Sequence, residues 1–411
     1  MPAGSRRTVF PDDHWSLQVD IPYSMGLASG ELIFLCGQAD LEGDGNVCHP
    51  DDLIAQTRSA IGHIANLFAA LDASLEDLVK LVVFYVPDDQ IDEDRYLDAI
   101  SAMLPGRHRP VITLVPVARL FYPGLVVEID AYGMQGERLE RREVPGENGF
   151  SSVIRCGEMV FGGAIRAVDA SAESIAAGDI VTQSHHVLAK LEARLGSVGA
   201  GVSDLVKINN WYVAGGSAEE WSESARVRAA FFPEPGPCAT GIPLPQLQRP
   251  GCLIQTDFWA MLGRDGEPLE KTHCWPDGHW DWPIHLPFKH GLRCGGLVFV
   301  GGQVSMNAAG EVVDHDDMAK QTRSSMDNLG KVLAGFGLDH GDILKLNTYY
   351  RGSTGDDTSN DARDLHDNVT IRGSYFDKPG PASTGIPFPC LAYPGMVIEI
   401  EAIASVDDPN N

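Results

Sequence analysis

Two glutamates stand at matching places in two similar apolar segments. Glu128 lies in "GLVVEIDAYG" and Glu399 lies in "GMVIEIEAIA". A carboxylate held in an apolar cleft can orient a water molecule or take a proton from it, because burial raises its pKa towards neutrality. On a strand, Glu128 shares its face with Val126 and Asp130, so a solvated or ion-paired face is the alternative.

Two turns with the sequence "TGIP" could bind an anionic substrate. Each places a threonine, Thr240 or Thr384, beside a glycine. A hydroxyl group and accessible backbone amides are then available to the ligand. The alternative is a tight turn with a capping hydroxyl, and the residues themselves leave both interpretations open.

The segments that carry these residues recur along the chain. "HWSLQVDIPYSMGLASGELIFLCGQ" at 14–38 returns as "HWDWPIHLPFKHGLRCGGLVFVGGQ" at 279–303, and the same shift superimposes the two "QTRS" segments. A more diverged copy lies between them, in which Lys207 and Tyr212 match Lys345 and Tyr350. A fixed spacing of this kind is typical of a repeated structural unit. The chain therefore contains one module written three times.

We place the modules at 14–134, 150–262 and 284–405. The segment 135–149 is a polar linker, and 263–283 is a second linker with three tryptophans, which is expected to pack on a module.

Each copy opens with short apolar runs that predict strands, such as "ELIFLCG". In the first copy an amphipathic helix follows over 53–71, with Asp51 or Asp52 as its cap. "LVKLVVFYV" predicts a central strand, and a second helix is expected at 91–104, with counterparts near 218–231 and 361–376. Two closing strands complete the order ββαβαββ. The fold class is α+β.

The run "GELIFLCGQ…QTR…LVKLVVFYV…RPVITLVPVARL…PGLVVEIDAYG" resembles the RidA/YjgF family of enamine and imine deaminases. The resemblance implies the chorismate-mutase-like fold of homotrimers, with ligand clefts between subunits. Three fused copies then imply an intrachain pseudo-trimer, present as a monomer or as a dimer of such rings. The "STG" turn is also similar, more weakly, to that of the chorismatases.

The family resemblance assigns roles to several positions. Glu128 and Glu399 match the water-activating glutamate, and the second copy has Gln255 there. Gly37 and Gly302 match the glycine whose carbonyl orients water. Aromatic substrate contacts fall on Tyr23 and Phe288, with Phe150 in the second copy.

The family's carboxylate-binding arginine has no counterpart at its usual position. Ile112, Ala239 and Ser383 stand there, and Leu114, Gly241 and Gly385 stand two residues later. We therefore expect Ser383 and Gly385 to line an altered substrate site, with Thr384 aiding catalysis.

Arginine pairs well with planar carboxylates, so another arginine is expected to replace the missing one. The candidates are Arg58, Arg109, Arg323, Arg351 and Arg372. Arg58 and Arg323 are expected on outward-facing helices. Arg109 and Arg351 adjoin the cleft-forming segments and are the preferred substrate-binding residues.

Composition excludes several classes of function. The 411 residues carry a formal charge of −26, which opposes binding to nucleic acid. No apolar run is long enough to span a bilayer and no secretory signal is visible, so a cytoplasmic protein is expected. The eight cysteines form no C-x-x-C pair, and the histidines suit helix caps or surface positions better than a metal site.

These observations predict a cofactor-independent hydrolase, with no metal, acting on a small enamine, imine or related conjugated metabolite. A chorismatase-like hydrolase that releases pyruvate is one alternative, and it would need an arginine pair in the third copy's cleft. A non-catalytic binding or chaperone-like protein is the other.

Overall fold

The computed structural model describes residues 6–12, 14, 15, 17, 19, 21–136, 139–353 and 361–406. In these residues the chain forms three modules that share one order of elements: three strands, a helix, a strand, a helix and two strands, with the third strand of the first module divided into two pieces that pair with the same neighbour. Each module therefore begins with one strand more than the sequence predicts.

The first module comprises β1 (Arg7–Val9), β2 (Gly26–Ser29), β3 (Leu32–Leu35), β4 (Gln38–Ala39), α1 (Leu53–Ala70), β5 (Leu78–Tyr85), α2 (Glu93–Met103), β6 (Val111–Pro116) and β7 (Val127–Met134). The second comprises β8 (Arg141–Pro145), β9 (Ser151–Cys156), β10 (Met159–Arg166), α3 (Ile180–Ser197), β11 (Leu205–Val213), α4 (Ala218–Phe231), β12 (Cys238–Leu244) and β13 (Ile254–Met261). The third comprises β14 (Lys271–Cys274), β15 (Gly291–Cys294), β16 (Leu297–Gln303), α5 (Met318–Ala334), β17 (Ile343–Arg351), α6 (Asp361–Gly373), β18 (Ala382–Phe388) and β19 (Ile398–Ser405). Short 3-10 turns at Leu75–Asp77, Val202–Asp204 and His340–Asp342 precede the central strands.

The additional strands of the second and third modules lie where the sequence predicts linkers. β8 and β14 fall within 135–149 and 263–283, and each pairs antiparallel with the next strand of its module. Such edge strands are short and half exposed, so their residues carry no apolar alternation that a sequence pattern could reveal.

The strand order is the same in each module. In the first it is β1-β2-β3-β7-β5-β6, and β8 to β13 and β14 to β19 repeat it. The last two strands of this order are parallel, and the others are antiparallel. The first and second sheets also meet, through β6 and β9.

Aspartate caps begin the first helix of every module. The side chains of Asp52, Asp179 and Asp317 each accept a hydrogen bond from a backbone N–H three residues later. This satisfies one of the free amides at the start of the helix. Among the described residues, no helix has the length and apolar character needed to cross a membrane.

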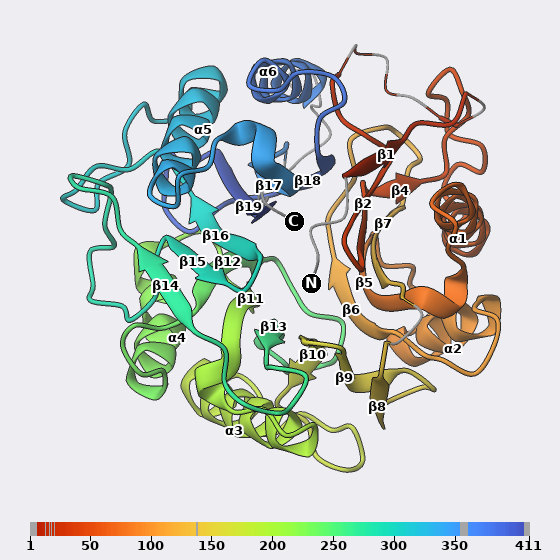
Figure 1. Ribbon diagram of the computed structural model, residues 1–411, viewed down its shortest axis with the longest axis horizontal. Helices are drawn as coiled ribbons and strands as arrows, with labels where there is room; N and C mark the ends of the chain where they lie inside the picture. The colour runs from red at the N-terminus through yellow and green to blue at the C-terminus, as the bar shows by residue number, and fades with distance from the viewer. Residues whose placement is uncertain are drawn as a thin grey trace.

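The modules contact one another in a cycle, with helices outside and strands facing the middle (Figure 1). β6 packs on β10, β12 on β16, and β18 on β3. Because helices cover one face of each sheet and other modules cover the opposite face, the central strand β5 is buried along its whole length.

Three buried ion pairs join the modules at the centre. Lys80 pairs with Asp257, Lys207 with Glu401 and Lys345 with Asp130, each at 2.7 Å between the lysine Nζ and a carboxylate oxygen. All six side chains are almost completely buried. Removing one partner would leave an uncompensated buried charge, so these pairs favour one arrangement of the modules.

Candidate functional site

The boundaries between modules form three clefts, named here by the modules that meet. In the 2–3 cleft, α4 and β12 face β16 and β19. In the 3–1 cleft, α6 and β18 face β3 and β7. With the space open to solvent included, the volume not filled by atoms is about 520 Å³ in the 2–3 cleft and about 570 Å³ in the 3–1 cleft. In the 1–2 cleft, α2 and β6 face β10 and β13.

Each of the two open clefts contains one of the predicted glutamates. Glu399 lines the 2–3 cleft from β19, and Glu128 lines the 3–1 cleft from β7. Each carboxyl group lies over a glycine of the neighbouring strand. A Cβ atom added at Gly302 would lie 1.8 Å from Glu399 Oε1, and one added at Gly37 would lie equally close to Glu128 Oε1. Only glycine leaves room for the carboxyl group there.

Burial makes both carboxyl groups weaker acids than usual. Burial first, and then the neighbouring Glu401, raises the pKa of Glu399 to about 8, against the opposing effects of Lys207 and the Gly241 backbone. Burial and Asp130 raise the pKa of Glu128 well above its ordinary value, against Lys345. The raised pKa of Glu399 lies near neutral pH, which suits proton transfer.

A buried arginine from the helix of the preceding module lines each open cleft. These are Arg228 of α4 in the 2–3 cleft and Arg372 of α6 in the 3–1 cleft, with exposed fractions of 4% and 2%. Within the described chain neither forms an ion pair with a carboxylate. Arg228 Nη1 donates to Ser224 Oγ at 3.1 Å, and Arg372 donates to Asn368 Oδ1 and to Ser383 Oγ.

Arg228 is buried without a carboxylate partner in the described chain, and this changes its acidity. Burial lowers the pKa of its guanidinium to about 10, and its Nε has no hydrogen-bond partner among the described residues. A buried cation without an anion is costly. Such a group is well suited to receive an anionic ligand.

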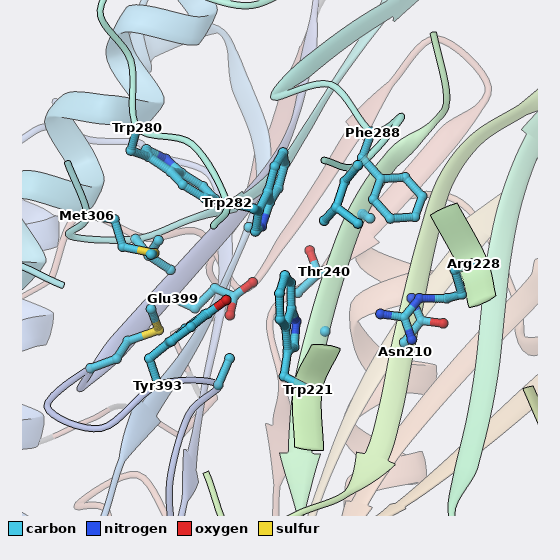
Figure 2. Close-up of a pocket in the computed structure, with 17 residues that line it drawn as sticks. Asn210, Trp221, Arg228, Thr240, Trp280, Trp282, Phe288, Met306, Tyr393 and Glu399 are labelled. Carbon is cyan, nitrogen blue, oxygen red and sulfur yellow. The ribbon is translucent and has the colours of Figure 1, made fainter. Parts of the chain in front are cut away.

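Five aromatic side chains of the described residues line the 2–3 cleft, those of Trp221, Trp280, Trp282, Phe288 and Tyr393. Figure 2 shows Trp221 in the middle of the view, with Glu399 and Tyr393 on one side and Arg228 on the other. Trp221 and Tyr393 pack with ring centroids 5.4 Å apart, and Trp280 and Trp282 at 4.8 Å.

Ion pairs between charged side chains bridge the third boundary, the 1–2 cleft, which is called the closed cleft below. Arg166 Nη1 lies 2.5 Å from Glu93 Oε2, and its Nε donates to Gln255 Oε1 at 3.2 Å. Gln255 in turn donates to the carbonyl oxygen of Leu114 at 2.7 Å. Arg249 pairs with Asp94 at 2.8 Å.

The repeat shows which residues of the other modules these side chains replace. Gln255 stands at the position of Glu128, and Arg166 stands at the position of Ala39. Arg166 pairs in register with Gln255, as Ala39 pairs in register with Glu128. Arg249 precedes the repeated Pro-Gly, where Tyr393 stands in the third module. The 1–2 cleft therefore has an amide in place of the acid, and its arginines already hold carboxylates.

The family model for "Endoribonuclease L-PSP" matches the chain three times, at residues 16–135, 141–261 and 283–406. The chain belongs to this family. A RutC family protein of Pyrococcus horikoshii is 27% identical over 119 residues, which are 29% of this chain and 86% of the relative. The 2-iminobutanoate/2-iminopropanoate deaminase of Escherichia coli is 30% identical over 90 residues, or 22% of this chain and 59% of that enzyme. The RidA/YjgF family expected from the sequence is confirmed.

Among solved structures, a chorismatase superimposes with a TM-score of 0.53 and 14% identity. The match covers 80% of this chain and 93% of the chorismatase. At this identity the likeness concerns the fold, and it extends over more than one L-PSP module.

Most residues predicted for the site of this L-PSP protein line an open cleft. Tyr23, Gly37, Glu128, Ser383 and Gly385 line the 3–1 cleft together. Phe288, Gly302 and Glu399 line the 2–3 cleft.

Three predicted site residues lie elsewhere. Thr384 Oγ1 donates to Asp130 and accepts from Lys345 at the centre of the ring, and it lines neither open cleft. The side chain of Arg109 donates to backbone carbonyls around 104–108, and Arg351 pairs with the exposed Asp316. The prediction combines Glu399 with Thr384 of its own module, whereas the threonine that lines the cleft beside Glu399 is Thr240 of the second module.

Two features of the site escape the sequence prediction. Arg228 is absent from the predicted candidates, although it lies ten residues before Cys238, as Arg372 lies ten before Ala382. The repeat therefore contains the signal. Trp280 and Trp282 belong to the predicted tryptophan-rich linker, yet they line the 2–3 cleft. No group of three or more His, Cys, Asp or Glu side chains in the described ranges is placed to hold a metal ion.

Proposed function

We propose that the protein is a cofactor-independent hydrolase of small imines or enamines that carry a carboxylate. The observation that carries this proposal is the repeated arrangement of a buried glutamate over a glycine, facing a cleft with a buried arginine that has no carboxylate partner. The 2-imino-acid deaminase named in the relative from Escherichia coli acts on the same class of compound.

In this proposal the arginine binds the substrate carboxylate, and the glutamate acts on water. The guanidinium of Arg228 or Arg372 takes the place of the strand arginine that Ala239 and Ser383 replace. The carbonyl group of Gly302 or Gly37 orients the water molecule beside the carboxylate. The substrate carboxylate neutralises a cation that the protein leaves uncompensated, so binding and orientation come from one contact.

The reaction needs one water molecule and no oxidant or reductant. The oxygen of water bonds to the imine carbon while Glu399 or Glu128 accepts its proton, and the electron pair of the C=N bond moves to nitrogen. Proton transfer to nitrogen and collapse of the tetrahedral adduct break the C–N bond. The products are a carbonyl compound and ammonia. For an enamine, the protonated glutamate first donates its proton to carbon, which a pKa of about 8 makes possible at neutral pH.

The test uses imines generated in situ. An amino-acid oxidase supplies imino acids, an amine oxidase supplies imines without a carboxylate, and semicarbazide traps whatever remains. We expect faster loss of imino acids in the presence of the protein. The double variant Arg228→Gln/Arg372→Gln should raise KM for imino acids roughly tenfold or more and leave KM for carboxylate-free imines unchanged. Imino-acid hydrolysis at the background rate with the wild-type protein would refute the proposal.

A pyruvate-releasing hydrolase is a second candidate, favoured by the fold likeness to a chorismatase over most of the chain. That function would need two arginines in one cleft, whereas one arginine lines each open cleft in the described chain. Incubation with chorismate and an assay for pyruvate separate the two candidates. Thermal stabilisation by these ligands without any turnover would instead indicate a binding protein.

We also infer that the three modules act as a fused trimer. The cyclic contacts and the three central ion pairs support this inference. The particle should then be a single chain or a dimer in light scattering, and a trimer of chains would contradict it.

A further inference from the structure

The two open clefts differ in the side chains that would contact the rest of the substrate. Helix α4 places Trp221 in the 2–3 cleft, whereas α6 places Leu365 and Val369 in the 3–1 cleft. The 2–3 cleft is further lined by Trp280 and Trp282. The repeat gives Trp280 a counterpart in the 3–1 lining, Trp15, whereas Leu17 stands there in place of Trp282.

The tryptophans of the 2–3 cleft are held in place by their neighbours. The indole Nε1 of Trp280 donates to Gln303 Oε1 at 3.1 Å. The ring of Trp282 stacks on His290 with an interplanar angle of 7°. Fixed ring faces form a preorganised surface, so a ligand that stacks on them loses little further side-chain freedom.

The charged groups of this cleft match a carboxylic acid. Arg228 is buried without a carboxylate partner, and Figure 2 shows it across Trp221 from Glu399. A ligand in this cleft would therefore meet a cation, aromatic rings and the glutamate in one lining. Met306 and Met396 also line this space, and the thioether of methionine makes favourable contacts with aromatic rings.

We propose that the 2–3 cleft binds a planar aromatic carboxylic acid, with its ring among Trp221, Trp282 and Tyr393 and its carboxylate on Arg228. The 3–1 cleft then serves acids with smaller or aliphatic side chains. The proposal rests on the proposed function in one respect: the bound acid would be the skeleton whose imine or enamine Glu399 hydrolyses. Aromatic rings gain attraction from edge and face contacts beyond the area that they bury, so an aromatic ligand is preferred to a saturated one.

Calorimetric titration with two unreactive acids tests the proposal. trans-Cinnamate carries a flat aromatic ring, and 3-cyclohexylpropanoate carries a saturated ring on a chain of equal length. The saturated acid is the more apolar, so burial alone would favour it. We expect trans-cinnamate to bind one site per chain about tenfold more tightly than 3-cyclohexylpropanoate.

Matched variants locate the site. Trp221→Leu and Arg228→Gln should each weaken trans-cinnamate binding about tenfold or more. Leu365→Ala, which changes the α6 residue at the position of Trp221, and Arg372→Gln both lie in the 3–1 cleft and should leave this binding unchanged. If Trp221→Leu does not fold, Tyr393→Leu removes the ring on the other side of the same contact.

The outcomes separate this proposal from the proposed function. Equal or tighter binding of the saturated acid, or a loss of binding in Arg372→Gln and not in Arg228→Gln, would overturn the aromatic site. Either result could coexist with imine hydrolysis. Selective binding of trans-cinnamate in a protein that hydrolyses no imine would support the aromatic site and refute the hydrolase.

Discussion

Buried arginines lie in all three clefts, but only the 1–2 cleft supplies them with carboxylates. Arg166 pairs with Glu93 there, whereas Arg228 and Arg372 have no anionic partner among the described residues. At the position where each open cleft has its buried glutamate, the closed cleft has an amide, Gln255. The comparison indicates that an intermodule cleft becomes structural when the protein itself provides both charges, and is available to a ligand when it provides one.

The largest effect on stability is expected in the closed cleft. Glu93→Gln leaves Arg166 buried without its anion, which should lower the free energy of unfolding by about 3 kcal/mol. In contrast, Arg228→Met removes a buried cation that has no anion to lose, so the change should stay within about 1 kcal/mol. Urea unfolding followed by tryptophan fluorescence measures both.

Glu219→Gln, an exposed carboxylate on α4, is the matched control and should change stability by less than about 0.5 kcal/mol. If Arg228→Met were as destabilising as Glu93→Gln, the open and closed clefts would not differ in the way described.

The next largest effect is expected on the rate of imine hydrolysis, when the glycines beneath the carboxyl groups of Glu128 and Glu399 are replaced. In the double variant Gly37→Ala/Gly302→Ala, each new Cβ would overlap a carboxyl oxygen and displace it. A displacement of about 1 Å at reacting groups can cost about 100-fold in rate, so imine hydrolysis should fall by about that factor. Steady-state kinetics with an imino acid measures it.

The second module provides the control for these glycines, since Ala164 already stands at the matching place. Ala164→Gly should leave turnover unchanged. Full activity of the double alanine variant would mean that the carboxyl groups over the glycines are not catalytic.

A smaller effect should appear as a pH dependence. In Glu128→Gln, turnover depends on Glu399, whose pKa is raised to about 8 by burial. The ionised form is the one that accepts a proton from water, and it becomes scarce as the pH falls below 8. The kcat/KM for a preformed imine should therefore fall about tenfold per pH unit between pH 8 and pH 6. A flat profile over this range would contradict the assignment of Glu399 as base.

Much of the fold follows from the sequence because three copies repeat the same apolar periodicity. Glu128, Glu399 and the glycines beneath them are predictable for the same reason, since each pair keeps its place in two copies. The edge strands β8 and β14 were not predictable, because their residues are half exposed and the partner strand alone determines their conformation.

The partners across each cleft were harder to predict from the sequence. Thr384 lies in the same repeat as Glu399, yet the cleft residues opposite Glu399 come from the preceding module. Which modules face each other depends on the cyclic packing and on buried pairs such as Lys207 with Glu401. The closed cleft shows the same limit, because Arg166 and Glu93 lie 73 residues apart.

The central claim is that two open clefts, each with one glutamate, carry the activity and that the closed cleft carries none. Imine hydrolysis by Glu128→Gln, Glu399→Gln and the double variant, each checked for a native thermal transition, tests it directly. Each single variant should lose only the activity of its own cleft, and the double variant should lose at least about 100-fold relative to the wild type. A folded double variant that hydrolyses imines at the wild-type rate would contradict the account.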